Sequence, residues 1–412
     1  MSLVTDNVRI GFIPLLDAAP VIAAAELGFA EREGLSLTLV LATSWATIRD
    51  RLAVGHVDAA HILAPMPLAA NLGLTPMPSP MVVPMTLGIG GNTVTVSAAL
   101  WRSLAGHGAP ADFAPAATAE TLAAEVHARA AAGRRRLCFG VVHPYSTHHY
   151  ALAYWLGAAG MVPGRDVELS VLPPSLMGPA LAGGQIDGFC AGEPWGSLAA
   201  HEHNGVILTT VAHIWRASPE KVLGVRSAWA DANPDRLASL LRAIHHACEW
   251  CDAPENGEEL AALLAKPAYL GLPAAAIRQS LARKLPAPDG SMRAVKDFLV
   301  FAQKAATFPW LSHALWLYTQ MVRWGQVHDT AANREAARAT YRPALYRAAL
   351  AAEGVPVPAA NAKAEGMLER ATPVGSPGGR LWLGPDGFFD GRVFDPDRID
   401  AYIAGFDRAA PR

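Results

Sequence analysis

Three short stretches between Pro144 and Lys221 place polar side chains at the tips of apolar runs. They are Pro144–His149, Gly188–Trp195 and Pro219–Lys221. Between them they carry imidazole, carboxylate and ammonium groups, which can bind a ligand or take part in proton transfer. Because ligands bind at strand tips in open α/β sheets, we expect these stretches to meet in one cleft.

The elements that would position these stretches form two α/β series. Uninterrupted apolar runs predict strands that are covered on both faces, and the periodic segments between them predict helices. The predicted strands of the first series are 8–14, 35–41 and 57–63, and those of the second are 137–142, 167–172 and 186–190, the second with helices 118–131, 147–159 and 175–183.

Extended segments flank the glycine-rich stretch Gly88–Asn92 and indicate a chain that passes from one lobe to another. Two α/β lobes joined by crossing segments are typical of hinged proteins that close on a small solute. We assign 8–92 and 222–330 to lobe 1, 93–221 to lobe 2, and 331–412 to a C-terminal extension that wraps the core and is expected to end in a hairpin over Gly387–Phe394.

Several predicted helices begin at the lips of this cleft, near Asp17, Ser44 and Thr147. All three residues are good N-caps, so we expect each to cap its helix. The free N–H groups and the positive dipole end of a helix start attract anions. The pattern therefore favours an anionic ligand.

Composition excludes several function classes. Of the 412 residues 51% are hydrophobic and 17% are charged, and the formal net charge is −2. The one basic block, Arg134–Arg136, is expected to be a solvated helix end, so no nucleic-acid partner is predicted. No apolar run is long enough to span a membrane. The first residues lack a secretory signal, which favours the cytoplasm, or the periplasm if a signal was removed.

The four cysteines predict neither a metal site nor a cofactor. Cys138 and Cys190 lie in apolar runs and are expected to be buried strand residues. Cys248 and Cys251 fall within a helical pattern, and no second pair completes a zinc site.

Several motifs together resemble the nitrate-binding component of bicarbonate/nitrate ABC transporters. The resemblance covers about residues 8–330 and the end of the chain. Its motifs are Asp17-Ala-Ala-Pro20, Ser44-Trp-Ala-Thr-Ile-Arg-Asp50, Ala60-His-Ile-Leu-Ala-Pro-Met-Pro67, Ser146-Thr-His148, Gly192-Glu-Pro-Trp195, Pro219-Glu-Lys221, Arg323-Trp-Gly325 and Phe388-Phe-Asp-Gly-Arg-Val-Phe394. It implies an α/β, two-lobed periplasmic-binding-protein fold of type II, with a hinge and a ligand cleft, plus a helical C-terminal extension.

The resemblance also implies a set of ligand residues and partners. The anion would bind to Trp45, Asn92, His148 and Lys221, supported by Asp17, Ser44, Thr147 and Glu193. Glu193 is expected to orient Lys221 or His148. The stretch His143–His148 looks more like the cytosolic nitrate/nitrite sensors, which release an antitermination regulator, than like the transport receptors, which serve an ABC permease.

The implied ligand residues form a pocket of hydrogen-bond donors. Nitrate and nitrite offer only acceptors, whereas bicarbonate has a hydroxyl that must donate. An unpartnered bicarbonate hydroxyl would cost about 1–3 kcal/mol, so we expect nitrate or nitrite as the ligand.

Two alternatives stay open. Similar lobes bind sulfonates, bicarbonate or pyrimidine precursors. The spacing Gly188-Phe-Cys-Ala-Gly192 also fits a nucleophile elbow, with Cys190 as nucleophile and His148 as base of a hydrolase. The order of these parts and the late helix start disfavour an enzyme.

Overall fold

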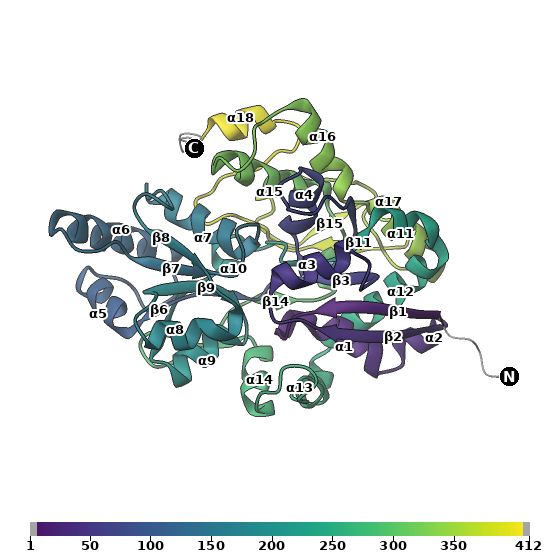
Figure 1. The fold of residues 1–412 in the computed structure, drawn as a ribbon, viewed down its shortest axis with the longest axis horizontal. Coiled ribbons are helices and arrows are strands. Elements are labelled where there is room, and N and C mark those ends of the chain that lie inside the picture. Colours follow the sequence, from purple (N-terminus) through teal and green to yellow (C-terminus); the bar gives the residue numbers. More distant parts are fainter. Residues whose placement is uncertain (1–5, 407–412) are drawn as a thin grey trace.

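The computed structural model describes residues 6–406, in which two five-stranded sheets lie side by side (Figure 1). The first sheet has the order β2-β1-β3-β11-β4, with β1 Asp6–Phe12, β2 Leu35–Leu41, β3 Ala59–Leu63, β4 Met81–Thr86 and β11 Lys221–Arg226. The second has the order β10-β6-β9-β7-β8, with β6 Asn92–Ser97, β7 Cys138–Val141, β8 Glu168–Val171, β9 Gly188–Gly192 and β10 Gly205–Thr210.

Helices cover both sheets and make up most of the C-terminal half. They are α1 Ala19–Glu26, α2 Phe29–Arg32, α3 Trp45–Ala53, α4 Pro65–Asn71, α5 Ala98–Gly106, α6 Pro115–Ala131, α7 Thr147–Ala158, α8 Met177–Ala182, α9 Trp195–Glu202, α10 Val211–Ile214, α11 Ser227–Ala232, α12 Pro234–Asp252, α13 Gly257–Leu264, α14 Ala274–Leu281, α15 Leu311–Arg323, α16 Ala331–Thr340, α17 Pro343–Leu350 and α18 Ile399–Ala404. Short pairs are β5 Ile89–Gly90 with β14 Leu299–Val300, β12 Lys284–Pro286 with β13 Met292–Ala294, and β15 Thr372–Val374 with β16 Leu381–Leu383.

Alternation along the strands of the first sheet builds a core on each of its faces. In β11, Leu223 and Val225 join the cluster that includes α1 and α12. Val222 joins the other cluster, which includes α3 and α4 and continues into the second lobe. Both faces are therefore apolar, as the uninterrupted runs predicted.

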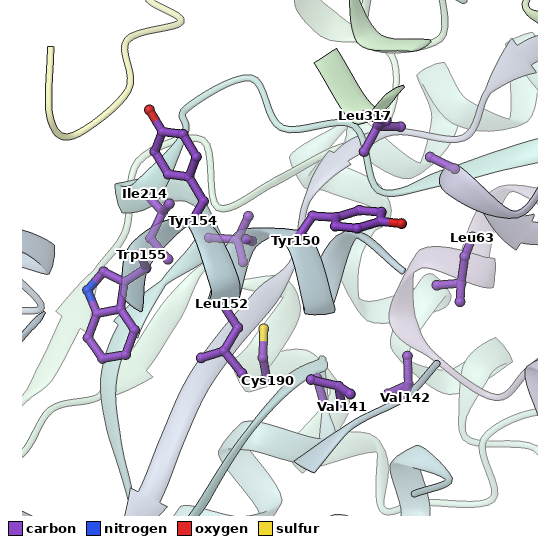
Figure 2. Packing of buried hydrophobic residues seen from close by; sticks show 14 of the residues in the cluster. Leu63, Val141, Val142, Tyr150, Leu152, Tyr154, Trp155, Cys190, Ile214 and Leu317 are labelled. Carbon is purple, nitrogen blue, oxygen red and sulfur yellow. The ribbon is translucent and has the colours of Figure 1, made fainter. Parts of the chain in front are cut away.

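The second sheet is packed against α7, a helix with apolar residues on nearly all sides. Figure 2 shows Leu152 of α7 beside Val141 and Cys190 of the sheet, and Tyr154 pointing away from them. This all-round burial arises because α7 lies between its sheet and α15.

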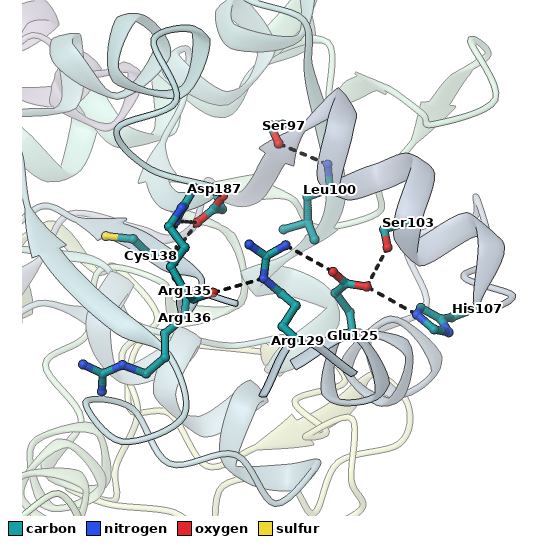
Figure 3. Close-up of polar contacts among 10 residues, drawn as sticks. All are labelled: Ser97, Leu100, Ser103, His107, Glu125, Arg129, Arg135, Arg136, Cys138 and Asp187. Atoms are coloured by element: carbon teal, nitrogen blue, oxygen red, sulfur yellow. Dashed lines mark hydrogen bonds and ion pairs between the residues drawn. The ribbon is translucent and has the colours of Figure 1, made fainter. Parts of the chain in front are cut away.

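The basic block Arg134–Arg136 lies exposed between α6 and β7, as predicted. Arg135 forms a two-point ion pair with Asp187, at 2.7 and 2.8 Å, and Asp187 also accepts the backbone N–H of Cys138 (Figure 3). The block thus ties the start of β7 to the turn before β9. Pairing at this exposed position contributes about 0–1 kcal/mol.

The C-terminal extension contains α16, α17 and α18, which lie with α15 over one side of the molecule (Figure 1). The hairpin expected at Gly387–Phe394 was wrong. Phe388 forms a bridge with Trp215, and Phe394 forms one with Glu365. The two aromatic side chains pack in the core, which keeps their segments from pairing with each other. Phe388 stacks on the Trp215 ring with centroids 4.7 Å apart, and Phe394 is fully buried. The exact lobe boundaries proposed above stay a prediction.

Candidate anion-binding site

The four predicted ligand residues lie at one edge of the two sheets. Trp45 follows the carboxyl end of β2, and His148 follows that of β7. Lys221 begins β11, which runs antiparallel to β3 and pairs Lys221 with Leu63. Asn92 begins β6, which runs antiparallel to β9 and pairs it with Gly192. Carboxyl strand ends, where ligands bind in such sheets, therefore collect all four side chains.

Lys221 is the centre of the site and is 0% exposed. Its Nζ donates to Asp17 Oδ2 and to Glu220 Oε1, both at 2.7 Å. The same nitrogen lies 5.3 Å from the centroid of the Trp45 ring. The structure thus brings Lys221 and Trp45 together, as predicted, and adds two carboxylates.

Glu220 joins the other two predicted residues to Lys221. Its Oε2 accepts a short hydrogen bond from Asn92 Nδ2. Its Oε1 lies 3.4 Å from His148 Nδ1. The expectation of a pocket built only from donors was therefore wrong, because a carboxylate of the chain lies among them.

Several buried donors of the site have no hydrogen-bond partner within residues 6–406. Trp45 Nε1 is one of them. Neither ring nitrogen of His148 makes a hydrogen bond of acceptable geometry, so the N–H that this ring carries is a second. Each buried polar atom without a partner costs about 1–3 kcal/mol, so such groups call for an explanation. An acceptor-rich ligand would supply one.

Charges at the site are set by burial and by close pairing. Burial works against the charge of Lys221, but Asp17 and Glu220 hold its pKa above the usual value. Burial would likewise raise the pKa of Asp17, yet Lys221 and a hydrogen bond from His61 hold it below normal. Burial lowers the pKa of His148 to about 4, so this imidazole is neutral at pH 7.

The four supporting residues behave in different ways, and only Ser44 caps as predicted. Its Oγ accepts the backbone N–H of Thr47 at the start of α3. Asp17 was expected to cap α1, but it lies in a 3-10 turn, Leu16–Ala18, and its carboxylate holds Lys221 and His61. A buried ammonium competes for this carboxylate more strongly than a backbone N–H does.

The cap of α7 is Ser146, and the prediction of Thr147 was one residue off. Ser146 Oγ accepts the backbone N–H of His149 at 3.0 Å. Thr147 Oγ1 is buried and makes no hydrogen bond to any residue that the structure describes. The stretch Ser146-Thr147 offers two hydroxyls, and only the one with extended backbone can reach the helix start.

Glu193 does not orient Lys221 or His148, which corrects a further prediction. Its carboxylate accepts from the backbone N–H of Ser197 at 3.1 Å and from Ser280 Oγ at 3.0 Å. Burial raises the pKa of Glu193, and these hydrogen bonds offset only part of that effect. Glu193 therefore fixes the start of α9 to α14, and none of its hydrogen bonds is to a proposed ligand residue.

Sequence reasoning missed two side chains of the site, Glu220 and His61. His61 is fully buried in β3, its Nε2 lies 2.9 Å from Asp17 Oδ1, and its ring lies 5.8 Å from that of Trp45. An ionisable residue inside the apolar run 57–63 was the available signal for His61. Glu220 was visible as the neighbour of Lys221 in Pro219-Glu220-Lys221.

The geometry of a cysteine hydrolase is not formed. Cys190 lies in the middle of β9, where it pairs with Val94, and no sharp strand-to-helix turn carries it. The thiol packs in the apolar cluster of Figure 2, and burial raises its pKa well above normal. A buried thiol that stays protonated is a poor nucleophile.

Metal-ligand clusters and membrane-spanning helices are both absent from residues 6–406. No group of three or more His, Cys, Asp or Glu side chains in that range is arranged to hold a metal ion. No helix within it is long and apolar enough to cross a membrane.

Two open α/β sheets with the predicted ligand residues at their shared edge match the two-lobed solute-binding proteins of the periplasmic-binding-protein fold. The chain belongs to the NMT1-like family, which it matches over residues 4–265. It is 32% identical, over 97% of its own length and 86% of the relative's, to the nitrate/nitrite binding protein NrtA of Synechococcus elongatus PCC 7942.

Two further comparisons concern Synechocystis PCC 6803. The crystal structure of its periplasmic nitrate-binding protein NrtA matches with a TM-score of 0.84 and 28% identity, covering 98% of this chain and 99% of that one. Its nitrate import ATP-binding protein NrtC is 36% identical over 78% of this chain. The chain spans 46% of the length of NrtC.

Proposed function

We propose that this protein binds nitrate or nitrite between its two lobes, with Trp45, Asn92, His148 and Lys221 as ligand residues. The observation that carries the proposal is the pair of orphaned donors, Trp45 Nε1 and the ring N–H of His148, in the same buried site as the Lys221 ammonium. A trigonal oxyanion offers the acceptors that these donors lack. The names of the NrtA relatives support the same ligand.

Glu220 gives this proposal a mechanism. A carboxylate is, like nitrate and nitrite, a planar oxyanion, and here it accepts from Asn92 and Lys221 and approaches His148. Nitrate that binds to these three residues has to displace Glu220, because like charges within one buried site repel. Glu220 therefore acts as an internal competitor that sets the affinity.

Bicarbonate is a second candidate because of the same residue. The carboxylates of Glu220 and Asp17 are acceptors beside Lys221, and either can accept a hydrogen bond from the bicarbonate hydroxyl. Preference for nitrate therefore depends on whether Glu220 remains in the site when the anion binds.

The cellular role of the protein depends on which protein partner it binds. We propose the sensing role, in the cytoplasm with an antitermination regulator as partner, on the stretch His143–His148; the alternative is a periplasmic receptor that serves an ABC permease. Pull-down of the regulator with purified protein, with and without nitrate, separates the two. Nitrate-sensitive capture supports sensing, and no capture in either condition contradicts it.

Titration calorimetry against nitrate, nitrite, bicarbonate and methanesulfonate tests the ligand assignment. We expect nitrate or nitrite to bind in the micromolar range and the other anions to bind at least about tenfold more weakly, a difference of about 1.4 kcal/mol. Bicarbonate binding equal to nitrate binding would reject the assignment, as would tighter binding of the sulfonate.

A further inference from the structure

A second buried cation lies far along the chain from the proposed nitrate site. Arg323 ends α15 and is 6% exposed. Its Nε and Nη1 have no hydrogen-bond partner in the described part of the chain. Arg323 belongs to the motif Arg323-Trp-Gly325, which the nitrate site does not use.

Aromatic rings cover the faces of the Arg323 guanidinium. Its Cζ lies 3.8 Å from the centroid of the Phe406 ring, 4.5 Å from Trp324 and 5.6 Å from Tyr154. Such contacts stabilise the charge by about 0.5–2 kcal/mol each. They satisfy the faces of the planar group and leave its N–H edge without acceptors.

Arg347 is a second arginine that lies over an aromatic ring, and its N–H groups do have hydrogen-bond acceptors. Its Cζ lies 5.0 Å from the centroid of the Phe308 ring. Its Nε donates to Pro358 O, its Nη1 to Asn361 Oδ1 and its Nη2 to Ala360 O, at 2.6–2.7 Å. Arg347 is thus satisfied on its faces and on its edge, whereas Arg323 is satisfied only on its faces.

Arg323 borders a hollow of about 1300 Å³ that is large enough for a small organic anion. Its charged lining is mostly basic, consisting of Arg136, Arg165, Arg323 and Arg392 against one acid, Asp390. Trp324 also lines it, and its Nε1 is a second buried donor without a partner among residues 6–406.

Glycine at position 157 keeps the guanidinium in place. A Cβ at Gly157 would lie 2.5 Å from Arg323 Nη2 and 3.1 Å from the Trp324 ring. The wall of α7 is therefore open where the arginine passes, and any larger residue would push the guanidinium aside.

We propose that this hollow is a second ligand site, which binds a carboxylate or phosphate group of a small anion on the edge of Arg323. Two neighbouring N–H groups of the guanidinium, Nη2 with either Nε or Nη1, match two oxygens of such a group in a bidentate pair. The Trp324 N–H supplies a third donor. Lys221 is not among the residues that line this hollow, so the second site is separate from the proposed nitrate site.

Titration calorimetry in saturating nitrate tests the site, with inorganic phosphate and succinate as separate probes. We expect one of the probes to bind with 1:1 stoichiometry and Arg323→Gln to weaken that binding at least about tenfold, the loss of a charged bidentate pair. The matched control is Arg278→Gln, which removes an arginine that lies outside the hollow and pairs with Glu258 at 2.8 Å. Its affinity should stay within about threefold of wild type, under 1 kcal/mol.

If Arg323→Gln fails to fold, Trp324→Phe provides a second variant that tests the same site. It keeps an aromatic ring for Arg323 and removes the indole N–H, so we expect several-fold weaker probe binding in a folded protein. The proposal is overturned if wild type binds neither probe at millimolar concentration. It is also overturned if folded Trp324→Phe, or folded Arg323→Gln, binds the probe as tightly as wild type.

Discussion

At the scale of single residues, Glu220 decides how the site behaves without ligand. Its carboxylate holds Lys221 and Asn92 and approaches His148, the donors that an anion would need. Side-chain direction at this position was not predictable, because Glu220 precedes β11 and strand alternation does not fix it. The position of Lys221 was predictable from the resemblance, whereas its double pairing was not.

Glu220→Gln should raise the affinity for nitrate at least about tenfold, because the competing negative charge is removed from the donors. Calorimetry measures this directly. Glu193→Gln is the matched control, since Glu193 is an equally buried glutamate whose partners are Ser197 and Ser280. Tenfold weaker nitrate binding in Glu220→Gln would show that Glu220 supports the ligand and does not compete with it.

Two neighbouring hydroxyls at the start of α7 should differ in their effect on stability. Ser146→Ala removes the cap of His149 N–H and should lower the free energy of unfolding by about 1–2 kcal/mol. Thr147→Val removes a buried hydroxyl that has no partner among residues 6–406. This change should leave the free energy of unfolding unchanged or raise it by up to about 1 kcal/mol. Urea unfolding in nitrate-free buffer measures both, and equal losses would contradict the assignment of the cap.

At the scale of elements, apolar runs predicted the sheets well. The run 35–41 coincides with β2, and the strands of the second series lie within one or two residues of their predicted bounds. Helix α6 begins at Pro115, three residues before the predicted start at residue 118, although proline in the first turn is itself a start signal. The 3-10 turn at Asp17 was not predicted. The Asp17 carboxylate accepts a hydrogen bond from Lys221, which is 204 residues away, and local sequence does not reveal such a distant partner.

The segment that leads into α7 should make the fold sensitive to mild acid. Burial lowers the pKa of His143, His148 and His149 to about 4, below the unfolded value of about 6.5. Between these pH values the unfolded chain binds protons that the folded protein excludes. Stability is therefore unaffected above about pH 6.5 and falls as pH drops toward 4, by up to about 4 kcal/mol per pH unit.

Urea unfolding at several pH values between 7 and 4 tests this dependence, and His148→Gln should reduce the slope by about a third. Carboxylates with lowered pKa, such as Asp17, lose their contribution only at lower pH and do not produce this window. A stability that stays level from about pH 6.5 to 4.5 would contradict neutral burial of these histidines.

At the scale of the whole molecule, the proposed ligand residues are closed off from solvent. Asn92, His148 and Lys221 are 0% exposed and Trp45 is 1% exposed. An anion can reach them only if the lobes separate, so an open state has to be populated without ligand. The linking segment at Gly88, Gly90 and Gly91 has positive φ at each glycine, which suits a hinge.

Small-angle X-ray scattering should detect this closure. A compact chain of 412 residues has a radius of gyration of about 22 Å. We expect nitrate to lower the radius of gyration toward that value and the nitrate-free protein to exceed it. An unchanged radius at saturating nitrate would contradict hinged closure.

The most direct test of the account is whether Lys221 is the cation that holds nitrate. Lys221→Glu alone would bury a third carboxylate beside Asp17 and Glu220 and endanger the fold. The better comparison is Glu220→Gln against the double variant Glu220→Gln/Lys221→Met, because the latter removes one charge of each sign relative to wild type.

Calorimetry with nitrate on these two variants, with circular dichroism as the folding control, decides the matter. Loss of a charge pairing in a desolvated site costs about 2–5 kcal/mol, so the double variant should bind about thirty-fold to several thousand-fold more weakly than Glu220→Gln. A folded double variant whose nitrate affinity stays within about threefold of Glu220→Gln would contradict the role of Lys221.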